Sequence, residues 1–472
     1  MDLKEIKSYY HKLMETRIKM DEIIQRQREY FQSGITLDIN FRKEILSKLH
    51  KTIKDYEDEI CTSLKKDLNK SFDESYMCEI GLCLSEITYM LKHIKSFAKK
   101  QRVLSPLAQF PSSSYTLKVP YGTVLIIAPW NYPFLLAIEP LIDAIAAGNV
   151  CIIKPSEYAP ETAKTIEKML SSCFEDKYVK VINGDHNVSK SLLNYKYDFI
   201  FYTGGESVGK EVLKKAALNL TPAVLELGGK SPCIIDTDVN LKLAAKRIIF
   251  GKFLNAGQTC VAPDYVLCPR ALKNDLKKEL IIQIKKQYND ALNDETYVRI
   301  INNKHFIRLL ALINKDKVIY GSKYDSDKLK IEPTILDDVS FDDTVMKEEI
   351  FGPILPIVYY DEYADIFKIL TDKPHPLALY IFSNNKLHIA EISKRINYGG
   401  GCINDTIIHL ASNNLPFGGV GNSGIGNYHG KYGFDTFSHT KAIVDKKTWL
   451  DLPMRYHPYK KNNAKLVRIF LK

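Results

Sequence analysis

The sequence contains no pair of cysteines separated by two residues, although nine of its 472 residues are cysteines. The nine are scattered along the chain, and because their number is odd they cannot all pair with one another. This spacing argues against a disulfide framework and against a structural zinc site, and we expect no bound metal. Free thiols persist in reducing compartments, which favours a cytoplasmic protein.

The sequence also has no apolar segment suited to a signal peptide or to a membrane span. Its first residues, MDLKEIKSYYHKL, carry several charges and have no apolar core. One apolar stretch, from Val119 to Ile153, contains Glu139, Pro140 and Asp143, which a membrane helix would have to bury. We expect a buried strand, a turn and a packed helix in this stretch, and no transmembrane segment.

The net charge of +10 is concentrated near the end of the chain, where nine lysines and arginines from residue 441 onward face only two aspartates. A basic tail of this kind is typical of a solvated surface or of a surface that contacts another subunit. Weak contact with an anionic membrane surface is the alternative. We do not expect nucleic acid as a partner.

Short β-rich runs alternate with helical patterns after a helical region from residue 3 to residue 70 and a Pro/Ser-rich connection from Ser105 to Ser114. The first series of expected strands is Thr123–Ile127, Val150–Ile153, Val179–Ile182 and Phe199–Tyr202, with helices over Pro133–Ala147, Pro160–Cys173 and Val208–Leu218. The second series is Ser231–Ile235, Tyr265–Cys268, Ile331–Ile335, Ile354–Tyr359 and Leu379–Ser383, with helices over Leu241–Asn255 and Leu272–Tyr288. Two such series predict an α/β fold with two Rossmann-like lobes, and a crevice between lobes is the usual place for a ligand.

Two glycine-rich motifs match nucleotide-binding signatures only in part. The segment Gly204–Lys210 matches G-x-x-x-x-G-K, but Glu211 follows where a P-loop needs Ser or Thr to ligate magnesium. Because it lies between a strand and a helix, it still offers free backbone N–H groups to a pyrophosphate. The segment Gly419–Gly424 matches G-x-G-x-x-G without a preceding strand, so we interpret it as a glycine-rich surface or hinge loop.

Two side chains have sequence surroundings suited to catalysis. Cys260 follows small and polar residues at the end of a predicted helix, a setting that offers a thiolate hydrogen-bond donors and partial exposure. Packing as a small buried hydrophobe is the alternative for this cysteine. Glu226 stands between two leucines ahead of a Gly-Gly turn, and burial there would raise its pKa toward that of a general base. A strand-end glutamate paired with Lys230 is the alternative for this carboxylate.

Seven motifs in a fixed order resemble the aldehyde dehydrogenase superfamily, most closely its class 3, fatty-aldehyde-type branch. They are Pro129-Trp130-Asn131-Tyr132-Pro133, Lys154-Pro155-Ser156-Glu157, Tyr202-Thr203-Gly204-Gly205, Leu225-Glu226-Leu227-Gly228-Gly229-Lys230, Gly257-Gln258-Thr259-Cys260, Glu349-Ile350-Phe351-Gly352-Pro353 and Leu415-Pro416-Phe417-Gly418-Gly419-Val420-Gly421. The resemblance extends from about Arg26 to Lys441, and the segment Tyr428–His439 resembles the class 3 version of the family's closing motif.

The resemblance implies an activity and a role for each part of the chain. The activity is NAD(P)-dependent oxidation of medium or long aliphatic or aromatic aldehydes to carboxylic acids. Residues 1–100 and 121–226 would form a helical N-terminal region with the cofactor-binding lobe, and residues 227–410 the catalytic lobe. Residues 101–120 and 411–472 would form bridging or oligomerisation segments and the basic tail. A homodimer is the family expectation.

The resemblance also implies the roles of the catalytic residues. Cys260 would attack the aldehyde carbon to give a thiohemiacetal. The side-chain amide of Asn131 and the backbone N–H of Cys260 would stabilise the oxyanion. Glu226 would activate water to hydrolyse the thioester that follows. Asn404 and Phe417 are expected to border the reacting centre.

The cofactor contacts implied by the resemblance are to NAD or NADP. Lys154 would hold the adenine-side ribose, and Glu349 would accept hydrogen bonds from the nicotinamide ribose with Phe351 packed beside it. The remaining cofactor-binding residues are expected to be Glu157, Gly204, Gly205, Val208 and Trp130.

The sequence departs from the family pattern after Gly204, where Gly205 and Glu206 replace a side-chain donor and a threonine. Gly205 permits close approach of the backbone to a pyrophosphate, whereas Glu206 adds negative charge unless it points outward. Glu157 can accept a ribose 2′-hydroxyl and repel a 2′-phosphate, yet class 3 members often use both cofactors, so the choice stays open. Two other functions remain alternatives, namely a CoA-acylating reductase and a catalytically silent binding relative; the presence of Glu226 favours hydrolysis.

Overall fold

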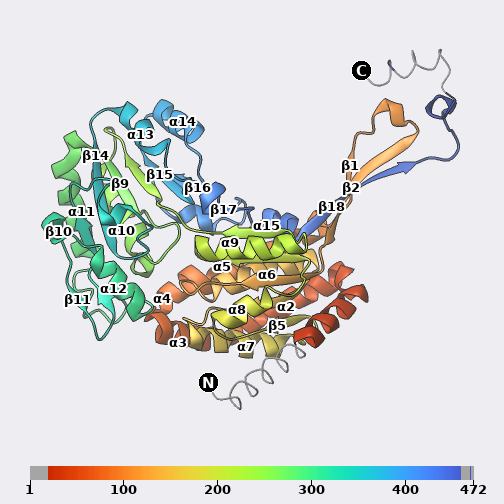
Figure 1. Cartoon of the computed structure of the whole chain (residues 1–472), viewed down its shortest axis with the longest axis horizontal. Coiled ribbons are helices and arrows are strands. Elements are labelled where there is room, and N and C mark those ends of the chain that lie inside the picture. Colours follow the sequence, from red (N-terminus) through yellow and green to blue (C-terminus); the bar gives the residue numbers. More distant parts are fainter. Residues whose placement is uncertain (1–19, 459–467, 469–472) are drawn as a thin grey trace, which may run out of the picture.

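The structure, a computed structural model, describes residues 20–458 and residue 468. Two α/β lobes form the body, and a narrow antiparallel sheet projects from one end of it (Figure 1). The α/β fold class expected from the alternating pattern is confirmed. The expected helical segment before residue 20 and the basic residues at 460, 461, 465 and 472 lie outside the described residues.

The first lobe is built on a six-stranded sheet in the order β17-β7-β6-β3-β4-β5. Its strands are β3 (Thr123–Ile127), β4 (Val150–Lys154), β5 (Val179–Val181), β6 (Phe199–Thr203), β7 (Ala223–Glu226) and β17 (Gly424–Ile425). Strands β3 to β7 are parallel, whereas β17 is antiparallel to β7. Every residue of β3, β4 and β6 is buried, as expected for a parallel sheet whose two faces are both covered.

The second lobe is built on a seven-stranded sheet in the order β10-β13-β14-β9-β8-β15-β16. Its strands are β8 (Pro232–Ile235), β9 (Tyr265–Pro269), β10 (Val318–Tyr320), β13 (Thr334–Leu336), β14 (Ile354–Tyr360), β15 (Ala378–Phe382) and β16 (Gly400–Ile403). All of its pairings are parallel except that of β10 with β13. A separate hairpin joins β11 (Tyr324–Asp325) to β12 (Lys330–Ile331).

The continuous strand expected over Ile331–Ile335 is wrong. Strand β12 ends at Ile331, and β13 begins at Thr334 in a different sheet. Pro333 lies between them, and because proline has no backbone N–H it cannot continue a hydrogen-bonded ladder.

Helices cover both parallel sheets. Those of the first lobe are α2 (Ile39–Asp55), α3 (Glu57–Leu68), α4 (Phe72–Ser75), α5 (Gly81–Phe97), α6 (Leu135–Ala147), α7 (Pro160–Cys173), α8 (His186–Leu192), α9 (Glu206–Leu218) and α15 (Gly430–Thr436). Those of the second lobe are α10 (Leu241–Phe253), α11 (Lys273–Gln287), α12 (Asn303–Ala311), α13 (Tyr363–Leu370) and α14 (Lys386–Arg395). Helix α6 is buried along its whole length because it packs against β3 and β4 as well as α2, α5 and α15. No helix among the described residues is both long and apolar enough to cross a bilayer.

The projecting sheet contains β1 (Gln101–Val103), β2 (Ser112–Pro120) and β18 (Ser438–Lys446), with β2 in the centre (Figure 1). Residues 411–472 were expected to form bridging or oligomerisation segments together with the basic tail, and part of this range, β18, lies in the projecting sheet. Strand β17 joins the first sheet beside β7, and α15 packs on α5 and α6. The reason is local: a Cβ at Gly424 would lie 2.3 Å from the Leu225 carbonyl oxygen, so glycine allows this strand to pack against β7.

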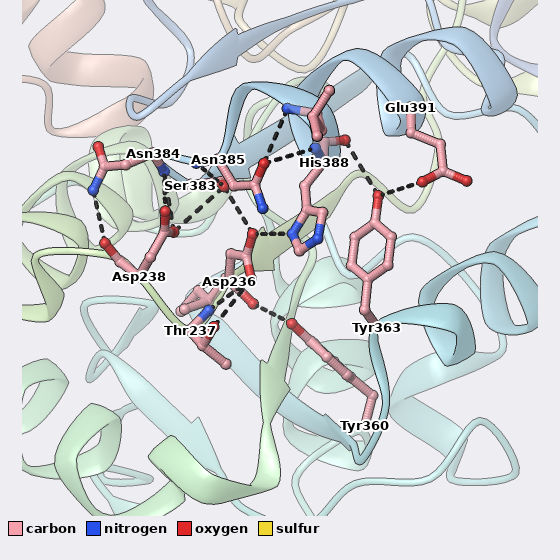
Figure 2. Close-up of polar contacts among 12 residues, drawn as sticks. Asp236, Thr237, Asp238, Tyr360, Tyr363, Ser383, Asn384, Asn385, His388 and Glu391 are labelled. Atoms are coloured by element: carbon pink, nitrogen blue, oxygen red, sulfur yellow. Dashed lines mark hydrogen bonds and ion pairs between the residues drawn. The ribbon is translucent and has the colours of Figure 1, made fainter.

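A polar network ties together the carboxyl ends of β8 and β15 (Figure 2). Asp236, directly after β8, accepts hydrogen bonds from Ser383 Oγ at 2.8 Å and from His388 Nδ1 at 2.7 Å. The His388 ring stacks on Tyr363 with the ring centroids 3.8 Å apart. Because the carboxylate bridges residues from two loops and α14, the network fixes this edge of the second sheet.

Replacing Asp236 by alanine is expected to lower the free energy of unfolding by about 2–3 kcal/mol, because Ser383 and His388 lose a charged acceptor. Differential scanning calorimetry of the two proteins measures the loss. The control is Asp361→Ala, which breaks an exposed ion pair with Arg270 at 2.9 Å and should change stability by less than about 0.5 kcal/mol. Equal losses in both variants would contradict the structural role of Asp236.

Candidate active site

Cys260 lies in a tightly folded loop between α10 and β9. Three consecutive residues, Asn255, Ala256 and Gly257, have positive φ angles of 53°, 51° and 73°. A Cβ at Gly257 would lie 2.3 Å from the carbonyl oxygen of Gly352, so only glycine fits at this position. The side chain of Gln258 holds the loop from within, because it donates to the carbonyls of Asn255 and Arg299 and accepts from the N–H of Ile301.

Cys260 is half-buried as a residue, and its thiol group lies in a buried environment. Burial raises its pKa to about 12, and the nearby carboxyls of Glu349 and Glu226 add to the effect. The thiol is therefore protonated at neutral pH in this arrangement, and positive charge or hydrogen-bond donors near the sulfur are needed to form the thiolate.

Glu226 is the last residue of β7 and is 2% exposed. Its two carboxylate oxygens have no hydrogen-bond partner among the described residues. Burial raises its pKa well above the usual value. Such a carboxyl is a stronger base once it is ionised, and its free oxygens can accept hydrogen bonds from a ligand or a water molecule.

Asn131 lies in the turn between β3 and α6 and is also buried. Its Nδ2 donates a hydrogen bond to the carbonyl oxygen of Gln258 at 3.1 Å, two residues before Cys260. Its own carbonyl accepts from Asn255 Nδ2 at 2.8 Å. The structure thus brings the predicted oxyanion donor against the loop that carries the predicted nucleophile, and leaves one amide hydrogen of Asn131 free for another acceptor.

Cys260 and Glu226 line one cavity of about 960 Å³, measured with its solvent-open mouth. Most of the other lining side chains are apolar, among them Leu82, Leu135, Leu136, Phe250, Leu254 and Leu410. Met77 and Ile408 also line the cavity and are 51% and 54% exposed, which places them at its mouth. An apolar cavity with a few polar groups at one place is the usual form of a small-molecule site.

Lys154 and Glu157 lie together at the carboxyl end of β4. Lys154 is buried, and its Nζ donates to the Pro155 carbonyl at 2.7 Å and to Glu157 Oε2 at 3.3 Å. Burial lowers the pKa of Lys154, although the Glu157 carboxylate opposes this shift. The carboxyl ends of parallel strands are the usual binding edge of α/β folds, so the pair is well placed for a ribose.

Gly204 and Gly205 connect β6 to α9. Gly205 directly precedes the helix, and a Cβ built there would meet no atom within 4 Å, so the space in front of the helix N-terminus is open. Val208 in the first turn is 44% exposed. Glu206, whose charge we expected to disturb this site unless it pointed outward, forms an ion pair with Lys210 at 2.6 Å on the helix surface. The helix N-terminus can therefore receive an anionic group.

Glu349 packs against the backbone after Glu226. A Cβ at Gly228 would lie 2.1 Å from Glu349 Oε2, so the Gly-Gly turn makes room for this carboxyl. Burial raises the pKa of Glu349 to about 8, and the charge of Asp264 adds to the shift. Phe351 follows with a positive φ of 50°, and its ring contacts Trp130 edge-on with centroids 5.3 Å apart.

The two residues expected to border the reacting centre have different positions. Phe417 lines the cavity and stacks on His429 with centroids 5.2 Å apart. Asn404 is not among the cavity-lining residues, and its side chain instead forms two hydrogen bonds with the backbone of Ser383, at 3.0 and 2.9 Å. The Asn404 side chain therefore binds the backbone just after β15.

An acidic cluster beside the cavity was missed in the sequence. His429 and Glu139 line the cavity and form an ion pair at 3.4 Å. Behind them lies Glu86, which accepts a hydrogen bond from the N–H of Gly430 at 2.8 Å, next to Asp143. The signal was present, because Glu139 and Asp143 are spaced by four residues in an otherwise apolar helix. Among the described residues no cluster has the composition of a metal site.

The two sheets and the cavity that carries side chains from both lobes define a two-lobed α/β enzyme. A model of the aldehyde dehydrogenase family matches residues 9–443, and the chain belongs to this family. It is therefore an aldehyde dehydrogenase, an oxidoreductase that oxidises aldehydes. Enzymes of this family use NAD(P).

Similar proteins cover nearly the whole chain. It is 46% identical over 448 residues to 4,4′-diaponeurosporen-aldehyde dehydrogenase of Staphylococcus aureus, an alignment that covers 94% of this chain and 97% of that protein. It is 40% identical over 455 residues to aldehyde dehydrogenase family 3 member A2 of Mus musculus, which covers 96% and 94% of the two chains. The solved structure of substrate-bound Staphylococcus aureus AldH has a TM-score of 0.94 and 45% identity and covers 96% and 99% of the two chains. The resemblance to the class 3 branch is thereby confirmed.

The acidic cluster predicts how stability depends on pH. Burial and the charge of Glu139 raise the pKa of Glu86 from 4.5 to about 7. A carboxyl whose pKa is higher in the folded protein than in the unfolded chain contributes most to folding stability at a pH below its unfolded pKa. That contribution is lost as the pH rises through the pKa of the folded protein. The free energy of unfolding of the wild type should thus fall by about 2–3 kcal/mol between pH 4.5 and 7. Glu86→Gln should not show this fall, because its amide does not titrate.

Chemical unfolding at several pH values measures this dependence in the wild type and in Glu86→Gln. Glu44→Gln, which makes the same chemical change at an exposed position of α2, should leave the wild-type dependence intact. If the Glu86→Gln curve runs parallel to the wild-type curve over the whole range, Glu86 is not the titrating group.

Proposed function

We propose that this aldehyde dehydrogenase oxidises medium-to-long aliphatic or aromatic aldehydes to carboxylic acids, with Cys260 as nucleophile and Glu226 as base. The observation that supports this proposal is that the only two reactive groups needed, a thiol and an unpaired carboxyl, line the same apolar cavity. The apolar lining supports an apolar substrate tail, because burial of hydrocarbon contributes about 0.8 kcal/mol per methylene group.

In the first step Cys260 attacks the aldehyde carbon as a thiolate, and the carbonyl π electrons move to oxygen to give a thiohemiacetal oxyanion. The free amide hydrogen of Asn131 and the backbone N–H of Cys260 donate to that oxyanion. The hydrogen bond from Asn131 to Gln258 supports this role, because it fixes the amide beside the Cys260 loop.

When bound beside this adduct, NAD(P)+ would supply the acceptor for its hydride, and Cys260 would then carry the acyl group as a thioester. The residues around the proposed cofactor site fit such a group. The open N-terminus of α9 can accept a pyrophosphate, and the pair Lys154 and Glu157 can bind ribose hydroxyls. Glu349 offers a carboxylate beside the Gly-Gly turn for the second ribose.

Glu226 completes the reaction. Its carboxylate takes a proton from water as the water oxygen forms a bond to the thioester carbon. The carbon–sulfur bond then breaks, and the thiolate of Cys260 leaves as the carboxylic acid is released. A CoA-acylating enzyme would transfer the acyl group to a thiol and would need no water-activating base, so the buried unpaired Glu226 favours hydrolysis.

Both nicotinamide cofactors remain candidates. The name of a 41% identical relative from Canis lupus familiaris, "Aldehyde dehydrogenase, dimeric NADP-preferring", states an NADP preference for that protein. Glu157, which is 31% exposed, would repel the 2′-phosphate of NADP unless Lys154 neutralises it. We propose that NAD is used and that the Lys154–Glu157 ion pair permits NADP as a second cofactor.

We further propose a cytoplasmic homodimer formed through the projecting sheet. Among the described residues, its outer strand β18 has no partner strand on one side, and Leu104, Leu107 and Trp449 nearby are 98%, 65% and 70% exposed. An open strand edge with exposed apolar side chains favours pairing with another chain. All nine cysteines are free thiols, which supports a reducing compartment.

The activity is tested with hexanal and either NAD or NADP, with and without CoA, by following absorbance of the reduced cofactor at about 340 nm. Cys260→Ala should lose activity by about 1,000-fold or more, because the covalent adduct cannot form. Glu226→Gln should give one stoichiometric burst of reduced cofactor followed by turnover slowed about 100-fold or more, because only hydrolysis is blocked.

The matched control is Cys402→Ala, which removes the only other cysteine of intermediate exposure and should retain activity within about 2-fold. If the wild type gave no change in absorbance with any combination of cofactor and CoA, the proposed reaction would be contradicted. Full activity of Cys260→Ala would remove Cys260 as the nucleophile, and a requirement for CoA would replace hydrolysis by acyl transfer to a thiol.

Mass photometry at nanomolar concentration tests the oligomeric state. The expected particle has twice the 53.9 kDa mass of one chain. Trp449→Asp together with Leu107→Asp should shift the population toward monomer, because two charges would be buried in the apolar contact. A wild-type protein that is monomeric at micromolar concentration would contradict the dimer.

A further inference from the structure

A fully buried ion pair lies behind the predicted oxyanion donor. Lys70 Nζ and Glu79 Oε1 are 2.5 Å apart, and both side chains are 0% exposed. Lys70 lies between α3 and α4, and Glu79 lies in a single π-helical turn, Tyr76–Ile80, between α4 and α5. Burial of two charges costs desolvation energy that their mutual attraction often does not recover. The presence of this buried ion pair is therefore not explained by stability alone. π-helical turns occur frequently at functional sites.

Glu79 holds the start of helix α6. Its second oxygen, Oε2, accepts hydrogen bonds from the backbone N–H of Phe134 at 2.9 Å and of Leu135 at 3.1 Å. These N–H groups belong to the first turn of α6 and have no partner within the helix. The carboxylate therefore fixes the end of the turn that begins at Asn131.

Lys70 holds the beginning of the same turn. Its Nζ donates to the carbonyl oxygen of Asn131 at 3.3 Å. It also lies 4.2 Å from the centre of the Tyr132 ring, a cation–π contact in a desolvated setting. A single ion pair thus holds residues 131 to 135 at both ends.

The turn held in this way contacts the Cys260 loop with its side chains. Asn131 Nδ2 donates to the Gln258 carbonyl at 3.1 Å, and the Tyr132 hydroxyl lies 2.6 Å from Thr259 Oγ1. Thr259 is the neighbour of Cys260 in the chain. A displacement of Lys70 or Glu79 would therefore move the amide of Asn131 relative to the thiol.

We propose that Lys70 and Glu79 are positioning residues for the oxyanion site, which they set through Asn131 and Tyr132. This inference rests on the proposed function of Asn131. An oxyanion donor acts only when it lies about 2.7–3.1 Å from the developing charge, and a displacement of about 1 Å can cost about 100-fold in rate. Loss of either buried partner leaves the other charge uncompensated and forces such a displacement.

The test uses hydrolysis of p-nitrophenyl acetate, an activated ester that a thiol nucleophile with an oxyanion site can cleave without cofactor, alongside hexanal oxidation. Lys70→Met and Glu79→Gln should each lower kcat for the ester by about 10- to 100-fold and change KM by less than about 3-fold. In an Asn131→Ala background the same substitutions should lower kcat by less than about 3-fold further, because the donor that they position is already absent.

Two further variants separate positioning from folding. Glu79→Asp keeps the charge but shortens the side chain by one methylene, so it should fold and still lose kcat about 10-fold. Asp67→Asn is the matched control, because Asp67 is another buried carboxylate that binds the first turn of a helix, through the N–H and hydroxyl of Thr162 at 2.7 and 2.8 Å. It should lower the thermal unfolding temperature and leave kcat within about 2-fold.

Independent, multiplying losses from Glu79→Asp and Asn131→Ala would overturn the inference, as would a Glu79→Asp enzyme with wild-type kcat. These outcomes differ from failure of the proposed function. A protein that cleaves the ester with the expected coupling but never oxidises hexanal retains the positioning pair and loses the proposed reaction.

Discussion

The hydrogen bond from the Asn131 side chain to the Gln258 carbonyl joins the two lobes beside Cys260, the proposed nucleophile. Asn131 belongs to the first lobe and Gln258 to the second, so the geometry of the site depends on how the lobes meet. Each side is held independently. The buried pair of Lys70 and Glu79 fixes the Asn131 turn, and the internal hydrogen bonds of Gln258 fix the loop with three positive φ angles. Rigid support from both lobes is what an oxyanion site requires, because its donors must be in place before charge develops.

Burial is the second constraint, and it acts on binding and on reactivity together. The apolar cavity that suits a hydrocarbon chain in the proposed reaction also buries Cys260 and Glu226, and this burial raises the pKa values of both groups. A thiol with a pKa of about 12 is a poor nucleophile until its thiolate is stabilised. Reactivity is thereby coupled to occupancy of the site, because groups that enter the cavity or bind beside it change the local charge. Functional sites commonly retain such costly groups at the expense of stability.

Much of the fold was predictable because its signals are local. Helix α7 begins and ends where its proline and apolar spacing predict, and β3 coincides with its expected strand. The place of β17 was not predictable in this way, because it depends on a contact between distant segments. Gly424 gave no local indication that it pairs with Glu226, because a two-residue strand has no periodicity. The effect of Glu206 on a pyrophosphate was left open in the sequence, and the structure shows this carboxylate in an ion pair with Lys210 on the helix surface.

For the site, the sequence by itself determined the identity of the proposed reactive groups: a thiol after Gly-Gln-Thr, a carboxylate before Gly-Gly and an amide after Pro-Trp. It also placed glycines where a Cβ would clash, such as Gly257 against the Gly352 backbone and Gly228 against the Glu349 side chain. Only the tertiary structure decided which groups share a cavity. It also decided that the Asn404 side chain bonds to the Ser383 backbone and does not line the cavity, and that Lys70 and Glu79 lie behind Asn131. The physical reason is that charge, exposure and hydrogen-bond partners are properties of the packed environment. Residues far apart in the chain create that environment, as Lys70 and Asn131 do.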